Sequence, residues 1–160
     1  MCLVPAWVSA VGRALDFGVT ANFNERIIGE FRANEGRVGG LLAGTPMMLV
    51  HHIGAKSGVT RVTPLTYAAQ GDGRYVIVAS NGGSPTHPSW YFNLRANPRI
   101  EAELGTETFT VEAEELGGSA RAELWPKLIA ASPSLGEFES KASRQIPLMV
   151  LIRQDRPIDP

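Results

Sequence analysis

The first part of the chain carries an apolar residue at every fourth position. This spacing places the apolar side chains on one slowly winding stripe of a helix, and it predicts one bent helix or two helices over residues 6–33. We expect the stripe to pack on the rest of the fold, with docking at a membrane surface or gating of a substrate pocket as the alternatives. Its members are Trp7, Val11, Leu15, Val19, Phe23, Ile27 and Phe31.

After residue 45 the pattern changes to that of strands. Short segments rich in apolar and β-branched residues alternate with glycine-containing turns, as in a meander. Alternating residues on both sides of Gly105 and Thr106 predict a hairpin with a two-residue turn. Strands are therefore predicted over residues 47–53, 60–69, 74–80, 100–104, 108–113 and 146–152.

Three short helices are predicted among these strands. A proline begins the segment 88–96 and another proline follows it, which is typical of a short helix. The segments 119–131 and 134–144 also have helical patterns. Six strands with helices inserted between them predict an α+β protein built on a closed barrel. A chain of 160 residues has the length of one domain, so we expect residues 1–160 to form a single domain. Within it we expect a helical segment over 1–36 and a barrel core over 45–153.

Composition and charge exclude several classes of function. Apolar residues make up 44% of the chain and charged residues 19%, which is typical of a globular protein. A net charge of -1 provides no general positive field for nucleic acid or anionic lipid. Cys2 is the single cysteine, so an internal disulfide and a cysteine-rich metal site are excluded. We expect a cytoplasmic protein without a signal peptide or membrane span; peripheral contact with the inner face of the cell membrane and the oligomeric state stay open.

The glycine-rich connection over residues 34–44 is a candidate lid. Its glycines allow hinge motion on both sides of three apolar residues, Val38, Leu41 and Leu42. The alternative is that these apolar residues belong to the core.

Most familiar catalytic motifs are absent, including the phosphate-binding Walker loop, the GxGxxG turn, the GxSxG elbow and the HExxH helix. His51 and His52 are adjacent on a predicted strand, so they point to opposite faces and do not form a metal site. His87 is assigned no role.

One turn has the chemistry of an anion site. Gly54 and Gly58 bound a tight turn that contains Lys56, and Arg61 follows shortly after. Backbone N–H groups in such a turn bind phosphate, while a lysine and an arginine add positive charge. The alternative is an ordinary solvated lysine in a hairpin turn.

Four segments of the chain carry a more specific signal: GAKSGVTRVTPL, VIVASNGGSPTHPSWYFNLRANPRI, LWPKLIAASPS and RQIPLMVLI. In their order and spacing, over roughly residues 41–153, the chain resembles the deazaflavin-dependent nitroreductase family. The resemblance implies a split β-barrel of the flavin-reductase type, with about six mainly antiparallel strands and helices packed around it. It also implies an oxidoreductase that transfers a hydride from reduced coenzyme F-420 to a small planar acceptor such as a quinone, an enone or a nitro compound.

The resemblance assigns residues to this site. The coenzyme's tail and phosphate would lie on the turn, with Lys56 and Arg61 opposing their negative charge. Ser80 is the candidate catalytic residue, as a hydrogen-bond donor to the acceptor oxygen, and the acceptor would also contact Leu41, Leu42, Leu135 and Phe138. The cofactor-binding set is Gly54, Ala55, Lys56, Ser57, Gly58, Val59, Thr60, Arg61, Thr63, Pro64, Leu65, Val78, Ala79, Ser80, Asn81, Ser89, Trp90, Tyr91, Phe92 and Asn93.

The chain also departs from the family pattern. Relatives that reduce nitro compounds carry lysine in place of Asn81 and tyrosines in place of Ser132, Leu135 and Phe138. The missing tyrosines predict poor reduction of nitroimidazoles. Two alternatives stay open: a non-catalytic carrier of deazaflavin or lipid with the same fold, and a relative that uses FMN.

Overall fold

The computed structural model describes residues 21–39, 46–131 and 133–154. Its centre is one sheet of seven strands with the order β2-β1-β5-β6-β7-β4-β3, all paired antiparallel. The strands are β1 (Met47–Ile53), β2 (Thr60–Thr66), β3 (Ala68–Gly71), β4 (Arg74–Val78), β5 (Arg99–Leu104), β6 (Glu107–Leu116) and β7 (Leu148–Arg153).

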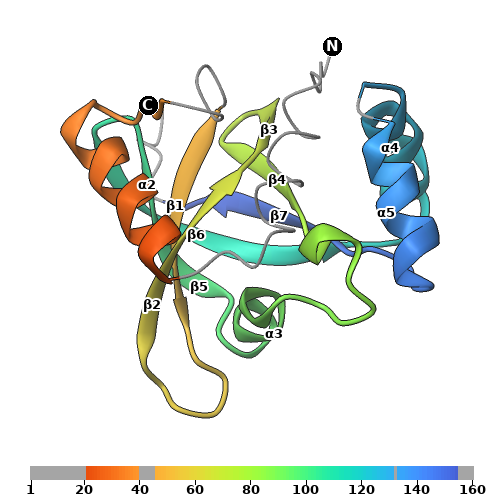
Figure 1. The fold of residues 1–160 in the computed structure, drawn as a ribbon, viewed down its shortest axis with the longest axis horizontal. Coiled ribbons are helices and arrows are strands. Elements are labelled where there is room, and N and C mark those ends of the chain that lie inside the picture. The colour runs from red at the N-terminus through yellow and green to blue at the C-terminus, as the bar shows by residue number, and fades with distance from the viewer. Residues whose placement is uncertain (1–20, 40–45, 132, 155–160) are drawn as a thin grey trace.

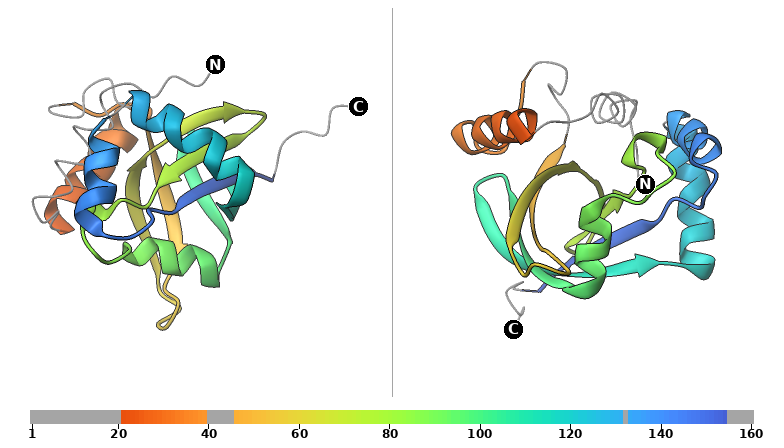
Figure 2. Two further views of the ribbon diagram at one scale, coloured as in Figure 1. Left: turned by 90° about the vertical axis from the view of Figure 1, so that its right-hand side faces the viewer. Right: turned by 60° about the horizontal axis from the view of Figure 1, so that its bottom comes forward.

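The sheet curls so strongly that it forms a split barrel (Figures 1 and 2). Its two edges, β2 and β3, are consecutive in the chain and separated only by Tyr67. Within the described residues no hydrogen-bonded ladder joins these edges, so the chain itself connects them. The predicted strand 60–69 is therefore two strands, and the six predicted strands are seven.

The predicted hairpin is confirmed. In β5 and β6, Leu104 pairs with Glu107 across the turn at Gly105 and Thr106. Gly105 has φ 61°, a left-handed conformation that glycine adopts without steric cost. Alternate residues of both strands, among them Ile100 and Val111, enter the barrel interior.

Four helices surround the sheet in the described part of the chain: α2 (Ala21–Ala33), α3 (Ser89–Ala96), α4 (Gly118–Ala131) and α5 (Ser134–Ala142). Helix α2 lies on one side of the molecule, and α4 and α5 lie together on the other side (Figure 1). Helix α3 lies at one end of the curled sheet, beside the turn between β1 and β2 (Figure 1). No helix in these described ranges is long and apolar enough to cross a membrane.

Apolar packing fixes α2 on the sheet. Ile27 and Phe31 are buried against Met47 and Leu49 of β1, together with Val38. The core-packing interpretation of the apolar stripe is thus confirmed for Ile27 and Phe31, and Val38 also belongs to this core. The first part of the predicted helical segment, 6–20, lies outside the described residues.

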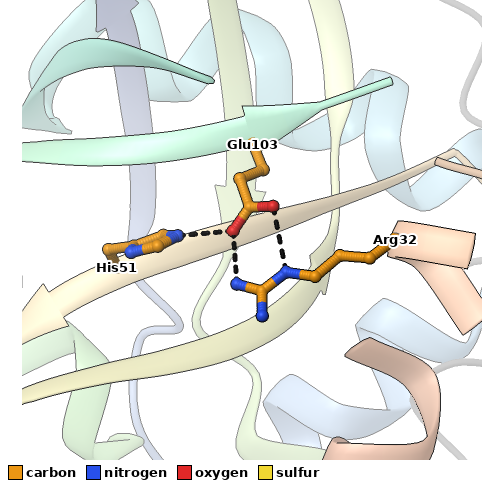
Figure 3. Close-up of polar contacts among 3 residues, drawn as sticks. All are labelled: Arg32, His51 and Glu103. Carbon is orange, nitrogen blue, oxygen red and sulfur yellow. Dashed lines mark hydrogen bonds and ion pairs between the residues drawn. The ribbon is translucent and has the colours of Figure 1, made fainter. Parts of the chain in front are cut away.

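A polar cluster supplements this packing (Figure 3). Arg32 of α2 donates from Nε and Nη2 to the two carboxylate oxygens of Glu103 on β5, at 3.1 and 2.7 Å. His51 Nε2 lies 2.6 Å from Oε2 of the same carboxylate. The Arg32 guanidinium lowers the pKa of Glu103 below its ordinary value, and the hydrogen bond to His51 lowers it further. The cluster joins α2, β1 and β5 on the outer face of the sheet.

Candidate functional site

A pocket of about 970 Å³ lies between the β1–β2 turn and helix α3. Its lining is basic: three of the ten residues are cationic and none is acidic. The lining residues are Gly54, Ala55, Lys56, Ser57, Arg61, Ser89, Phe92, Asn93, Arg95 and Ala96. Eight of these ten were predicted to bind the cofactor.

Helix α3 supplies one wall of the pocket. Ser89, Phe92, Asn93 and Ala96 recur at the spacing of one helical face. Other residues of α3, including Trp90 and Leu94, enter the barrel core and hold the helix in place. Phe92 is 47% exposed and therefore presents a flat apolar ring beside the cationic side chains.

The β1–β2 turn forms the facing wall. Gly58 N donates to Gly54 O, and Gly54 N donates to Val59 O, both at 2.9 Å. Gly58 has φ 71°, which an L-residue rarely adopts. Ser57 Oγ accepts a hydrogen bond from Val59 N at 3.2 Å. These bonds close a compact turn whose residues 55–58 are exposed. Because the N–H groups of Ala55 and Gly58 bond within the protein, the side chain of Lys56 and the backbone of Lys56 and Ser57 are the parts of the turn that can face a ligand.

Polar side chains tie the turn to α3. Ala55 N donates to Asn93 Oδ1 at 2.9 Å, and Asn93 Nδ2 lies 2.9 Å from His52 Nδ1. His52 Nε2 lies 2.8 Å from Thr63 Oγ1 on β2. Burial lowers the pKa of His52 to about 4, and the positive charges of Arg61 and His51 contribute to the shift. His52 is therefore neutral at physiological pH.

The donor set fits coenzyme F-420, whose phosphate and glutamate tail is anionic. Lys56 is a mobile point charge, and Arg61 and Arg95 carry planar guanidinium groups that bind phosphate or carboxylate through two donors. None of the described residues that line the pocket carries an opposing negative charge. Phe92 gives an aromatic surface for a ring system.

The other predicted cofactor residues are distributed around this pocket. Gly58, Val59 and Thr60 are exposed in and after the turn. Leu65, Ala79, Trp90 and Tyr91 are buried in the barrel interior, where the core-packing interpretation of Trp90 applies. The hydroxyl of Tyr91 donates to Glu115 Oε1 at 2.6 Å, which raises the pKa of Tyr91 in addition to the effect of burial.

Two predicted cofactor residues face away from the barrel interior. Pro64 pairs with Leu49 of β1, and side chains of directly paired residues share a face, so Pro64 lies on the side covered by α2. Val78 packs against the cluster beneath α4 and α5. Strand alternation explains both positions, because neighbours along a strand point to opposite faces.

Ser80 and Asn81 begin the loop that follows β4. Ser80 is buried, and its carbonyl oxygen accepts hydrogen bonds from Gly83 N and Arg144 Nη2. Asn81 is exposed, and its side-chain amide donates to Thr86 O at 3.0 Å. Neither residue lines the pocket between the turn and α3.

Arg144 organises this loop. Its guanidinium donates to the carbonyl oxygens of Ala79, Ser80, Ser84 and Thr86. It also donates to His87 Nδ1 at 2.7 Å, and burial together with the charge of Arg144 lowers the pKa of His87. Sequence analysis gave no sign of this role, because the contacts join segments about 60 residues apart.

The predicted acceptor residues lie in a different part of the fold. Leu135 and Phe138 of α5 are buried in the apolar cluster beneath α4 and α5, at 1% and 7% exposure. Leu135 therefore reaches no ligand unless α5 moves. Leu41, Leu42 and Ser132 lie outside the described residues.

Arg95 and Ala96 are the pocket residues that sequence analysis missed. Their signal is the helical spacing: Arg95 follows Phe92 by three positions and Ala96 follows Asn93 by three. A helical projection of residues 88–96 identifies them once Phe92 and Asn93 are assigned. The predicted absence of a metal site stays a prediction, and among the described residues no group of three or more histidines, cysteines or carboxylates has the arrangement of a metal site.

The protein is a half-barrel: a curled antiparallel sheet with a basic pocket, lined in part by Phe92, at one end. The model of the F420H(2)-dependent quinone reductase family matches residues 26–153. A protein of Mycobacterium tuberculosis strain H37Rv, named an F420H(2)-dependent quinone reductase, is 40% identical over 128 residues, which are 78% of this chain and 85% of the relative. The chain belongs to the F420H(2)-dependent quinone reductase family.

Solved structures agree with this assignment. The F420-H2 dependent reductase FDR-A has a TM-score of 0.57 and 39% identity, covering 66% of this chain and 93% of that chain. A second structure, described as a domain-swapped dimer, has a TM-score of 0.60 and 38% identity, covering 79% and 92%. The expected deazaflavin family, its oxidoreductase class, coenzyme F-420 and the split barrel are thereby confirmed.

Proposed function

We propose that the chain transfers a hydride from reduced coenzyme F-420 to a quinone, and that the pocket between the β1–β2 turn and α3 holds the coenzyme. The observation that carries the proposal is the lining: Lys56, Arg61 and Arg95 line the same pocket as the exposed ring of Phe92, and none of the described lining residues is acidic. Family membership supports the coenzyme and the acceptor class.

When bound, reduced F-420 supplies the hydride, so the protein needs few reactive side chains of its own. Lys56, Arg61 and Arg95 would bind the anionic tail, and the backbone N–H groups of Lys56 and Ser57 would orient a phosphate. Phe92 contributes an apolar ring to the pocket wall, against which a bound ring system would pack. Pre-arranged groups of this kind speed hydride transfer by holding the two reactants in a fixed orientation.

The acceptor half of the site is also part of the proposal. The Ser80 hydroxyl donates to the acceptor oxygen, and Arg144 keeps the Ser80 loop in a fixed conformation for this task. Leu41 and Leu42 are further candidates for contact with the acceptor. We place the protein in the cytoplasm, in line with its single cysteine.

The direct test measures oxidation of reduced F-420 by menadione in the presence of the purified protein. We expect turnover that saturates with both the coenzyme and the quinone. Saturable binding of F-420 without oxidation by any quinone would identify a carrier instead. A protein that purifies with bound FMN and does not bind F-420 would identify an FMN-dependent enzyme.

A further inference from the structure

His52 is a buried polar residue to which the proposed function assigns no part. Its side chain lies on the inner face of β1, at the end of the strand nearest the pocket, and only 3% of the residue is exposed. The next residue but one begins the coenzyme-binding turn. The imidazole can influence the conformation of the turn through its hydrogen bonds. Its influence therefore depends on which atom donates and which accepts in each bond.

The hydrogen bonds determine which ring nitrogen of His52 carries the proton. Ala55 N–H is a donor only, so the Asn93 atom that meets it at 2.9 Å is the amide oxygen. The NH₂ group of Asn93 therefore faces His52 Nδ1 and donates to it. His52 Nδ1 accepts, and the proton resides on Nε2, which donates to Thr63 Oγ1.

This arrangement fixes the orientation of the Asn93 amide. A flip of the amide would turn its NH₂ group toward the N–H of Ala55, and two donors would then face each other. The lone pair of His52 Nδ1 disfavours that flip because it accepts only from the NH₂ group. Burial lowers the pKa of the imidazole, so the ring stays neutral and the lone pair of Nδ1 stays available.

We infer that His52 is a positioning residue for the coenzyme site: through the Asn93 amide, it holds the backbone of Ala55 and thus the turn that carries Lys56 against α3. The inference rests on the proposed function for the identity of the ligand. The hydrogen-bond chain itself is independent of the ligand, because it joins β2, β1, α3 and the turn within the protein.

Two substitutions separate the two bonds of His52. In His52→Asn, an amide oxygen takes the place of Nδ1 and accepts from Asn93, while the bond to Thr63 is lost. In His52→Gln, the longer side chain places its amide near the position of Nε2 and keeps the bond to Thr63, while Asn93 loses its acceptor. Both variants replace an imidazole by an amide in the same buried place. Because Asn is the smaller residue, a loss of packing alone would affect His52→Asn at least as much as His52→Gln.

The first readout needs no coenzyme: it is the hydrogen-exchange rate of the Ala55 amide, measured by NMR on the purified full chain. We expect His52→Gln and Asn93→Ala to raise this rate at least tenfold and His52→Asn to leave it within about twofold of the wild type. The second readout is the dissociation constant for oxidised F-420, which we expect to rise roughly tenfold in His52→Gln, as for the loss of one hydrogen bond, and to stay within about threefold in His52→Asn.

His51→Asn is the matched control. It changes the adjacent histidine, whose side chain bonds Glu103 on the opposite face of the strand, so it should change neither Ala55 exchange nor F-420 affinity. Equal effects of His52→Asn and His52→Gln on both readouts, in step with their melting temperatures, would overturn the positioning role. If the wild type binds no F-420, the proposed function fails, whereas the exchange rates of Ala55 still decide the role of His52.

Discussion

At the scale of single residues, His52 couples the stability of the fold to pH. Its pKa in the folded protein is about 4, below the 6.5 of an unperturbed imidazole. Between these values the unfolded chain binds a proton that the folded chain does not bind, so the free energy of unfolding falls as the pH falls from 6.5 to 4. Above 6.5 the contribution of His52 is constant.

This predicts a difference between the wild type and His52→Asn. The variant lacks the titrating group, so its stability should fall less on acidification. Urea denaturation at pH 7 and pH 4.5 should show an extra loss of about 2 kcal/mol in the wild type. Parallel changes in the two proteins would show that His52 does not titrate as its burial requires.

Arg144 is the second residue whose role depends on geometry. Its planar guanidinium satisfies four carbonyl oxygens and His87 at once, which a lysine ammonium cannot do. We expect Arg144→Lys to lower the free energy of unfolding by about 2 kcal/mol, since several partly buried acceptors lose their donors. Thermal and urea unfolding measure this loss, and a variant as stable as the wild type would contradict the role.

At the scale of elements, helix α2 shows which interaction dominates. Phe31 is 1% exposed in the cluster between α2 and β1, whereas Arg32 and Glu103 form a partly exposed ion pair. Phe31→Ala should therefore cost about 3 kcal/mol or more, and Glu103→Gln about 1 kcal/mol or less. Urea unfolding of both variants checks the order, and a larger loss in Glu103→Gln would reverse the conclusion.

The same ion pair has its own pH dependence. Because the folded protein lowers the pKa of Glu103, the carboxylate contributes stability above its ordinary pKa, and this contribution is lost as the pH falls through the lowered value. Its range begins at a lower pH than that of His52, whose contribution changes from pH 6.5 downward.

Much of this element structure follows from the sequence because apolar alternation is a local signal. The β5–β6 hairpin combines a period of two with a glycine that adopts positive φ, so pattern and turn agree. The break at Tyr67 between β2 and β3 was missed, because Tyr67 continues a run of residues that suit a strand. The two strands are distinguished by their partners, because β2 pairs with β1 at one edge of the curled sheet and β3 pairs with β4 at the other.

The parts of the site that lie in short continuous segments could be predicted from the sequence. The turn at Lys56 and the α3 residues Ser89, Phe92 and Asn93 each lie in a short segment, and the resemblance to a family supplied their roles. The His52–Asn93 bond and the contacts of Arg144 join distant segments, so no local pattern shows them. Pro64 lies on the outer face because it pairs with Leu49, and the sequence by itself does not show this pairing.

At the scale of the whole molecule, the choice of acceptor is the first question. The chain has Leu135 and Phe138 where nitro-reducing relatives carry tyrosines, and both side chains are packed in the apolar cluster of α5. We expect efficient reduction of menadione and at least tenfold lower kcat/KM for a bicyclic nitroimidazole. Steady-state kinetics with both acceptors and the same reduced F-420 test this, and comparable values would contradict it.

The central claim is that the basic pocket binds the coenzyme, and its most direct test is the affinity for F-420 after removal of the three cations. We expect Lys56→Gln, Arg61→Gln and Arg95→Gln together to raise the Kd at least a hundredfold at low salt, with a much smaller difference at high salt because ions screen the attraction. The control, Arg26→Gln with Arg74→Gln and Arg99→Gln, removes the same charge from exposed positions outside the pocket lining and should change the Kd less than threefold. Equal losses in the two triple variants, or unchanged affinity in the first, would contradict the account.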